Sequence, residues 1–190
     1  MVSFDNDIKR CIKVLKSGGI ILYPTDTIWG IGCDATNEKA VEKIFALKKR
    51  PDKKSMIILV AYEKDIFKYV NNPDKKLLDY LSATEKPTTV IYERAKNIAQ
   101  NLISSDGTIA IRIIKDNFCK QLLIQYKKPI VSTSANISGE PFPTCFNDIS
   151  TEIKNGVDYM VQHRQNDLMS SQPSSIIKLN TEGTIDILRS

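Results

Sequence analysis

The chain has 190 residues, of which 42% are hydrophobic and 26% charged; this favours one globular domain over residues 1–190 and excludes collagen-like, low-complexity and disordered chains. The longest apolar run, Met56 to Ala61, is far shorter than the roughly 18 residues of a membrane span, and residues 1–5 lack a signal pattern, so we expect a cytoplasmic protein without a membrane partner. The formal net charge of +5 suits an anionic ligand such as a nucleotide or nucleic acid, and equally an ordinary basic surface.

The cysteines and the single histidine exclude several kinds of site. Cys11, Cys33, Cys119 and Cys145 are widely scattered, with no C-x-x-C pair and none near His163. This argues against a zinc ribbon, a disulfide framework and a multi-histidine metal site, and it leaves the metal ligands, if any, unknown. Catalysis is therefore expected to use groups other than histidine.

Helical and strand patterns alternate along the chain. Apolar residues at helical spacing predict helices over residues 5–17, 36–49, 116–125 and 147–154, with short helices around Ile66 and Leu77. Apolar or β-branched runs predict strands over residues 20–23, 56–60, 88–92, 108–113, 130–132, 174–179 and 184–188. The last two runs form a hairpin around Gly183, so the sheet is mixed, and we expect an α/β fold with one twisted mixed sheet flanked by helices.

The first polar cluster follows the predicted strand 20–23. Residues 23–27, Tyr-Pro-Thr-Asp-Thr, place two hydroxyls and a carboxylate where the strand ends, and loops at strand ends are common ligand sites. An ordinary turn, in which Asp and Thr bind nearby backbone, explains the same residues.

The second cluster has five cations in residues 48–54, Lys-Lys-Arg-Pro-Asp-Lys-Lys. Such charges suit a helix C-terminus and a solvated loop. Alternatively, Lys48 and Arg50 converge on one anion if the helix unwinds before Pro51.

The third cluster, residues 132–139, is rich in small hydroxyl and amide side chains after an apolar strand. Its successive N–H groups can bind phosphate or carboxylate oxygens, although a serine-rich turn has the same composition. There is no nucleophile elbow and no Walker A pattern, so any nucleotide is held in another way.

The fourth signal is Arg112 in an otherwise apolar strand. Burying its guanidinium is costly unless a carboxylate or phosphate neutralises the charge. That anion is either an internal Asp or Glu or a bound ligand.

Taken together in this order, these segments resemble the YrdC-like family over nearly the whole chain. The matching motifs are residues 18–34, Lys48-x-Arg50-Pro51, 108–112, 132–139 and 174–177. The pairing of K-x-R with S-x-N, the latter at Ser134 to Asn136, is typical of the family members that join L-threonine, bicarbonate or carbon dioxide, and ATP into threonylcarbamoyl-adenylate with Mg²⁺.

The resemblance implies a YrdC-like fold with a concave basic cavity and a role for each matched residue. Threonine would be held by Thr27, Arg112, Ser132 and Ser174. ATP would be held by Arg50, Lys54, Thr108, Ser134, Asn136 and Arg189. Lys48 and Arg50 would stabilise the developing charge, and the product would pass to a transferase complex that modifies tRNA.

Two positions depart from the family pattern. Leu59 stands where some relatives have a histidine, and Phe142 where some have a serine, so neither is expected to make a polar contact with ligand. The chain ends without the usual continuation after Arg189.

Two other functions remain open. One is a non-catalytic YrdC-like protein whose basic face binds RNA with strong salt dependence. The other is transfer of a different carbamoyl group, as in hydrogenase maturation, for which the chain lacks the expected zinc-finger and acylphosphatase segments.

Overall fold

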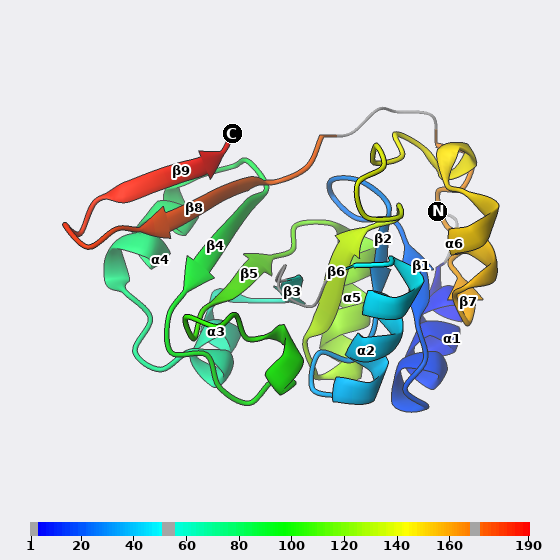
Figure 1. Cartoon of the computed structure of the whole chain (residues 1–190), viewed down its shortest axis with the longest axis horizontal. Coiled ribbons are helices and arrows are strands. Elements are labelled where there is room, and N and C mark those ends of the chain that lie inside the picture. Colours follow the sequence, from blue (N-terminus) through cyan, green and yellow to red (C-terminus); the bar gives the residue numbers. More distant parts are fainter. Residues whose placement is uncertain (1–3, 51–55, 168–171) are drawn as a thin grey trace.

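Helices and strands alternate through the computed structural model, which describes residues 4–50, 56–167 and 172–190 (Figure 1). The α-helices in these ranges are α1 (Asp5–Lys16), α2 (Glu38–Leu47), α3 (Glu63–Tyr69), α4 (Lys75–Ala83), α5 (Asn117–Tyr126) and α6 (Thr151–Asn155). The strands are β1 (Ile21–Tyr23), β2 (Gly30–Gly32), β3 (Ile57–Val60), β4 (Thr88–Tyr92), β5 (Ile109–Ile113), β6 (Ile130–Ser134), β7 (Tyr159–Met160), β8 (Ser175–Leu179) and β9 (Ile185–Arg189). Single 3₁₀ turns, η1 and η2, cover Gln100–Leu102 and Phe146–Asp148.

The strands form one sheet in the order β7-β1-β2-β6-β3-β5-β4-β8-β9. The pairs β1–β7, β3–β5 and β4–β8 are parallel, whereas the other neighbours are antiparallel. This confirms the predicted mixed sheet and α/β class, and the closing β8–β9 hairpin is also as predicted.

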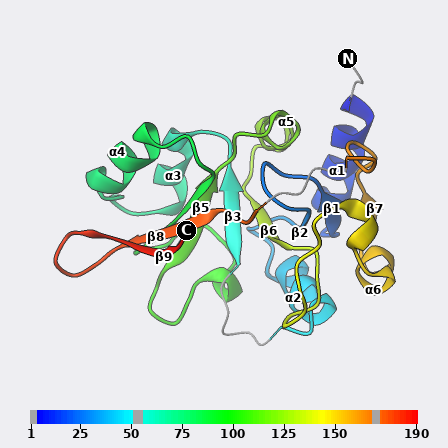
Figure 2. The same cartoon turned by 90° about the horizontal axis from the view of Figure 1, so that it is seen from above.

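Two apolar cores cover the two faces of the sheet (Figures 1 and 2). One core joins α1 to α5 through residues such as Ile8, Leu15, Phe118 and Leu122. The other contains the apolar faces of α2, α3 and α4. No helix within the described ranges is long and apolar enough to cross a membrane.

Several predicted boundaries were wrong. The helix predicted to be capped by Thr36 or Asn37 is capped by Asn37, whose Oδ1 accepts a hydrogen bond from the N–H of Ala40 at 3.2 Å, but it ends at Leu47 and not at Lys49. The cations of residues 48–50 therefore follow the helix instead of lying in its last turn. The helix predicted over 147–154 is divided into η2 and α6.

Strands β2 and β7 were not predicted. Two of the three β2 residues are glycines, which carry no apolar pattern but allow close packing. A Cβ on Gly32 would lie 2.3 Å from the carbonyl oxygen of Val131, so only glycine lets β2 approach β6 so closely.

Strand alternation positions the polar residues of the site. Leu59 of β3 pairs with Arg112 of β5, and Ile57, two residues before Leu59, pairs with Ser132 of β6. Residues two apart in a strand share a face, so Arg112 and Ser132 point to the same face of the sheet. Thr89 of β4 pairs with Arg112 and shares this face. Beyond the part covered by α1 and α5, this face carries a row of buried polar side chains.

Candidate functional site

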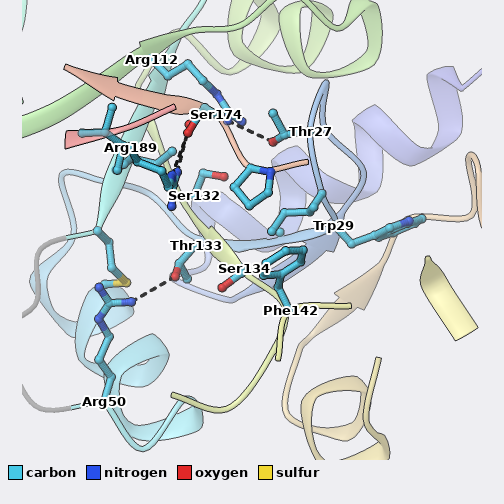
Figure 3. Close-up of a pocket in the computed structure, with 16 residues that line it drawn as sticks. Thr27, Trp29, Arg50, Arg112, Ser132, Thr133, Ser134, Phe142, Ser174 and Arg189 are labelled. Atoms are coloured by element: carbon cyan, nitrogen blue, oxygen red, sulfur yellow. Dashed lines mark hydrogen bonds between the residues drawn. The ribbon is translucent and has the colours of Figure 1, made fainter. Parts of the chain in front are cut away.

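A cavity of about 240 Å³ opens on this face of the sheet (Figure 3). Its polar lining consists of hydroxyls and three guanidinium groups: Thr27, Ser132, Thr133, Ser134, Ser174, Arg50, Arg112 and Arg189. No Asp or Glu is among the described residues that line it. The cavity is therefore concave and cationic, as the resemblance implied, and it suits an anionic polar ligand.

Arg112 anchors the innermost part of the cavity and is only 2% exposed. Its Nη1 donates to Oγ1 of Thr27 at 3.0 Å, and its Nη2 lies 3.2 Å from Oδ1 of Asp26. The loop after β1 thus supplies both a carboxylate and a hydroxyl to one guanidinium. From the sequence, the anion that neutralises Arg112 was either an internal acid or a bound ligand. In the structure Arg112 pairs with Asp26 and also lines the cavity.

The Thr27 hydroxyl is itself held in place. Thr25 Oγ1 lies 2.9 Å from Thr27 Oγ1, accepts from the Thr27 N–H at 3.0 Å and donates to the carbonyl of Ile28 at 2.9 Å. The turn expected from the residue types therefore exists, and it serves to orient Thr27 toward Arg112.

Ser174 is fixed on the opposite wall by two residues from other strands. Its hydroxyl lies 2.8 Å from that of the fully buried Thr89. Arg189 Nε donates to the Ser174 carbonyl at 2.9 Å, and Arg189 Nη2 to the Ser174 hydroxyl at 3.4 Å. Burial, and secondarily the charge of Arg112, lowers the pKa of Arg189, so an anion between these guanidiniums would relieve their repulsion.

Arg50 lines the more open part of the cavity, together with Thr133 and Ser134. Its Nη1 donates to Thr133 Oγ1 at 3.4 Å, and all three residues are half-buried. Burial lowers the pKa of Arg50, because its guanidinium is partly desolvated.

Lys48 is not among the lining residues and is 1% exposed. Its ammonium donates to the carbonyl oxygens of Ser134 and Asn136, the latter at 2.5 Å, and to Oδ1 of Asn136 at 3.4 Å. Asn136 in turn donates to the carbonyls of Ile137 and Glu140. In these contacts the K-x-R and S-x-N motifs meet, but Lys48 and Asn136 shape the loop and are not among the residues that line the cavity.

The remaining predicted residues have separate positions. Thr108 does not line the cavity, and its hydroxyl donates to Oδ1 of Asp106 at 2.6 Å. Lys54 lies outside the described residues. Leu59 is buried in the α1–α5 core. Phe142 lines the cavity and is 40% exposed, so it provides apolar wall.

Sequence reasoning missed three residues that shape this cavity. Trp29 was assigned no role in the site, but it lines the cavity and its ring centroid lies 4.9 Å from that of Phe146. Asp26 was noted in the first polar cluster, residues 23–27, but its pairing with Arg112 was not predicted. Thr89 is a hydroxyl residue in a largely apolar strand, and nothing else in the sequence marks it. Its place beside the cavity follows only from its pairing with Arg112.

Comparison with known proteins places this geometry among proteins of one family. The model of the Sua5/YciO/YrdC family, described as "Telomere recombination", matches residues 13–190. The chain is 33% identical over 178 residues to a threonylcarbamoyl-AMP synthase of Pseudoalteromonas translucida, covering 92% of this chain and 94% of that protein. It is 34% identical over 189 residues to a putative threonylcarbamoyl-AMP synthase of Methanocaldococcus jannaschii, covering 96% and 87%.

A solved structure shares the fold. The crystal structure of P. abyssi Sua5 complexed with L-threonine matches with a TM-score of 0.86 at 22% identity. The match covers 97% of this chain and 54% of that one, so the chain spans about half the length of that protein.

Proposed function

Because the chain belongs to the Sua5/YciO/YrdC family, we propose that it is a threonylcarbamoyl-AMP synthase. It joins L-threonine, bicarbonate or carbon dioxide, and ATP into threonylcarbamoyl-adenylate and pyrophosphate. The observation that carries this proposal is the convergence of Thr27, Arg112, Ser132 and Ser174 in one cationic cavity. The family resemblance implied a threonine contact for all four residues, and they come from distant segments of the chain.

Threonine occupies the inner part of the cavity in this proposal. Arg112 receives the substrate carboxylate, since a guanidinium offers a planar fork to the two oxygens. The hydroxyls of Thr27, Ser132 and Ser174 accept from or donate to the amine and the side-chain hydroxyl. With Arg112 already oriented by Asp26 and Thr27, little ordering remains to be done on binding.

ATP extends from this inner part toward Arg50, Ser134 and Arg189. A cavity of about 240 Å³ lies below the roughly 300–1,000 Å³ of drug-sized ligand pockets, so it accommodates the amino acid and the reacting phosphate while the nucleoside lies outside it. Lys54, Thr108 and Asn136 remain predicted ATP residues, Thr108 and Asn136 through the loops they shape.

Magnesium fits this scheme as part of the substrate. Among the described residues no group of three or more His, Cys, Asp or Glu is placed to hold a metal ion. We therefore expect Mg²⁺ to arrive on the triphosphate of ATP, where it offsets the phosphate charge.

The chemistry has two steps that need positioning more than a protein nucleophile. The threonine amine attacks carbon dioxide, or bicarbonate with loss of water, to give a carbamate. A carbamate oxygen then bonds to the α-phosphorus while the bond from that phosphorus to the bridging oxygen of pyrophosphate breaks. Negative charge grows on the departing pyrophosphate, and Arg50 is the cation best placed to stabilise it.

Lys48 contributes to the same step in our proposal. Its side-chain nitrogen fixes the loop that carries Ser134, and when this nitrogen is protonated its charge adds to the field of Arg50 across the loop. Direct contact of Lys48 with substrate remains a prediction.

The product then serves tRNA modification. We propose that the threonylcarbamoyl group passes to a transferase complex acting on a tRNA adenosine, and that this takes place in the cytoplasm. Any contact of this chain with tRNA is a prediction from the same resemblance.

The decisive experiment follows the product. The purified chain is incubated with ¹³C-bicarbonate, threonine, ATP and Mg²⁺, and the products are analysed by mass spectrometry. We expect a labelled threonylcarbamoyl-adenylate and pyrophosphate release that stops when threonine is omitted. ATP hydrolysis without threonine, or salt-sensitive RNA binding with no product, would contradict the proposal.

A further inference from the structure

A second cavity, of about 300 Å³, lies between helices α3 and α5 and shares no lining residue with the first. We call it the α3–α5 groove. It is lined by Val60, Ala61, Tyr62, Lys64, Asp65, Lys68, Tyr69, Leu123, Ile124, Lys127, Lys128 and Pro129. The proposed synthesis uses none of these residues.

The floor of the α3–α5 groove is apolar. Val60 and Ala61 at the end of β3, together with Leu123 and Pro129, are buried but line the groove. A groove with such a floor gains free energy when an apolar side chain displaces water from it.

The rim of the groove is strongly positive. Four lysines line it against a single acid, Asp65. Two of these lysines are already paired, Lys68 with Asp65 and Lys128 with Asp34, each at 2.7 Å. Lys64 and Lys127 have no ion pair among the described residues, so the rim retains positive charge that an acidic partner would complement.

An exposed aromatic side chain, Tyr62, lies on this rim. Tyr62 is 41% exposed, and the ammonium groups of Lys64 and Lys120 lie 5.3 and 5.0 Å from its ring centroid. Exposed aromatic residues next to an apolar groove are typical of protein-binding surfaces.

From these features we propose that the α3–α5 groove binds an acidic amphipathic segment of a partner protein. Apolar side chains of the segment enter the groove, and its carboxylates meet Lys64, Lys120 and Lys127. The space between two helices suits a helical segment with apolar residues at spacings of three and four. RNA fits less well, because its phosphates gain nothing from an aliphatic floor and the groove lacks arginine. The proposal does not depend on the synthase activity.

The test uses a defined probe and the full chain. A fluorescein-labelled 15-residue peptide carries leucines at helical spacing and glutamates on both flanks; a second peptide has lysines in place of the glutamates. Fluorescence anisotropy is expected to show saturable binding of the acidic peptide only. The triple variant Lys64→Glu, Lys120→Glu, Lys127→Glu should weaken binding at least tenfold, and Tyr62→Ala several-fold.

A matched control separates the site from overall charge. Lys9→Glu, Lys13→Glu, Lys16→Glu makes the same change in net charge on exposed positions of α1 and should leave peptide binding unchanged, with circular dichroism confirming that both variants fold. Absence of saturable binding, or equal binding by the groove triple variant, would overturn the proposal. A labelled single-stranded RNA that binds the wild type and loses affinity in the groove triple variant, where the peptide never bound, would also overturn it and identify an RNA site.

Discussion

The inner part of the cavity and its Arg50 side are built differently, although both carry a guanidinium and hydroxyls. In the inner part, Thr27, Arg112, Ser132 and Ser174 are all at most 6% exposed. Arg112 is bonded to Thr27 and paired with Asp26, and Ser174 is bonded to Thr89, so these side chains are oriented before any ligand arrives. On the Arg50 side, the arginine follows the end of α2, and its bond to Thr133 measures 3.4 Å.

This difference indicates two modes of recognition. The inner part presents a rigid template, which suits selection of one small amino acid. The Arg50 side presents a half-buried cation after a helix end, which suits a phosphate chain whose charge moves during the reaction. Substitutions in the inner part should therefore affect threonine, and substitutions on the Arg50 side should affect ATP and turnover.

The largest effect is expected from Arg112→Met. The variant lacks the proposed partner of the threonine carboxylate. It also leaves the largely buried Asp26 carboxylate without its cation, which should lower the free energy of unfolding by about 3–5 kcal/mol. We expect kcat/KM for threonine to fall about 1,000-fold, measured by pyrophosphate release. Arg112→Lys, which keeps the charge but not the fork, should lose less; a fall under tenfold in the methionine variant would refute the assignment.

Arg50→Ala should lower turnover by about 100-fold, or about 3 kcal/mol of transition-state stabilisation. Since the inner part is untouched, threonine should still bind, as titration calorimetry can test. If threonine affinity falls as much as turnover, the two parts of the cavity are not separate.

Lys48→Met tests how the buried amine of Lys48, which binds the loop of Ser134 and Asn136, affects stability. Burial, and secondarily the charge of Arg50, lowers the pKa of Lys48 from 10.5 to about 7. Between about pH 7 and 10.5 the unfolded chain binds a proton that the folded chain has released, so this residue makes the free energy of unfolding rise with pH. We expect the stability of the wild type to increase relative to that of Lys48→Met by roughly 1 kcal/mol per pH unit from pH 7 to 9. Urea unfolding at each pH measures this, and parallel pH profiles would contradict it.

The smallest effect is expected from Asp26→Asn, which preserves shape but removes the ion pair with Arg112. The guanidinium should become less well oriented, and KM for threonine should rise about tenfold, or about 1.4 kcal/mol, with KM for ATP unchanged. Asp79→Asn, the same change at an exposed position of α4 that does not line the cavity, is the control. An equal rise in both KM values would show that Asp26 acts through general stability.

Apolar periodicity was sufficient to predict most of the fold but not all of it. The five residues of β4 were predicted with their exact bounds, because β-branched residues fill that strand. Strand β2 was missed because its two glycines are selected by the closeness of β6, a tertiary contact. The division of residues 147–154 into η2 and α6 likewise reflects local capping, with Ser150 starting α6.

For the site, the sequence was a better guide to which residues line or support the cavity than to the direction of their side chains. Every predicted threonine residue lines the cavity. Strand alternation sets the face of Arg112 and Ser132, whereas Thr27 is oriented by the turn after β1 and Ser174 directly precedes β8. Lys48 and Asn136 lie in loops, and nothing in their spacing reveals that they bind each other instead of facing the cavity. Arg189 was the least expected contact, yet it holds Ser174 in place.

The residues that line the cavity are synthesised at different times during translation, and this affects when the cavity can form during folding. Thr27 emerges early from the ribosome. Ser174 directly precedes the β8–β9 hairpin and Arg189 ends it, and this hairpin pairs with β4 from the middle of the chain. Contacts this distant in sequence form slowly. A nascent chain can therefore bury much of its core while its substrate-binding surface is still lacking a side.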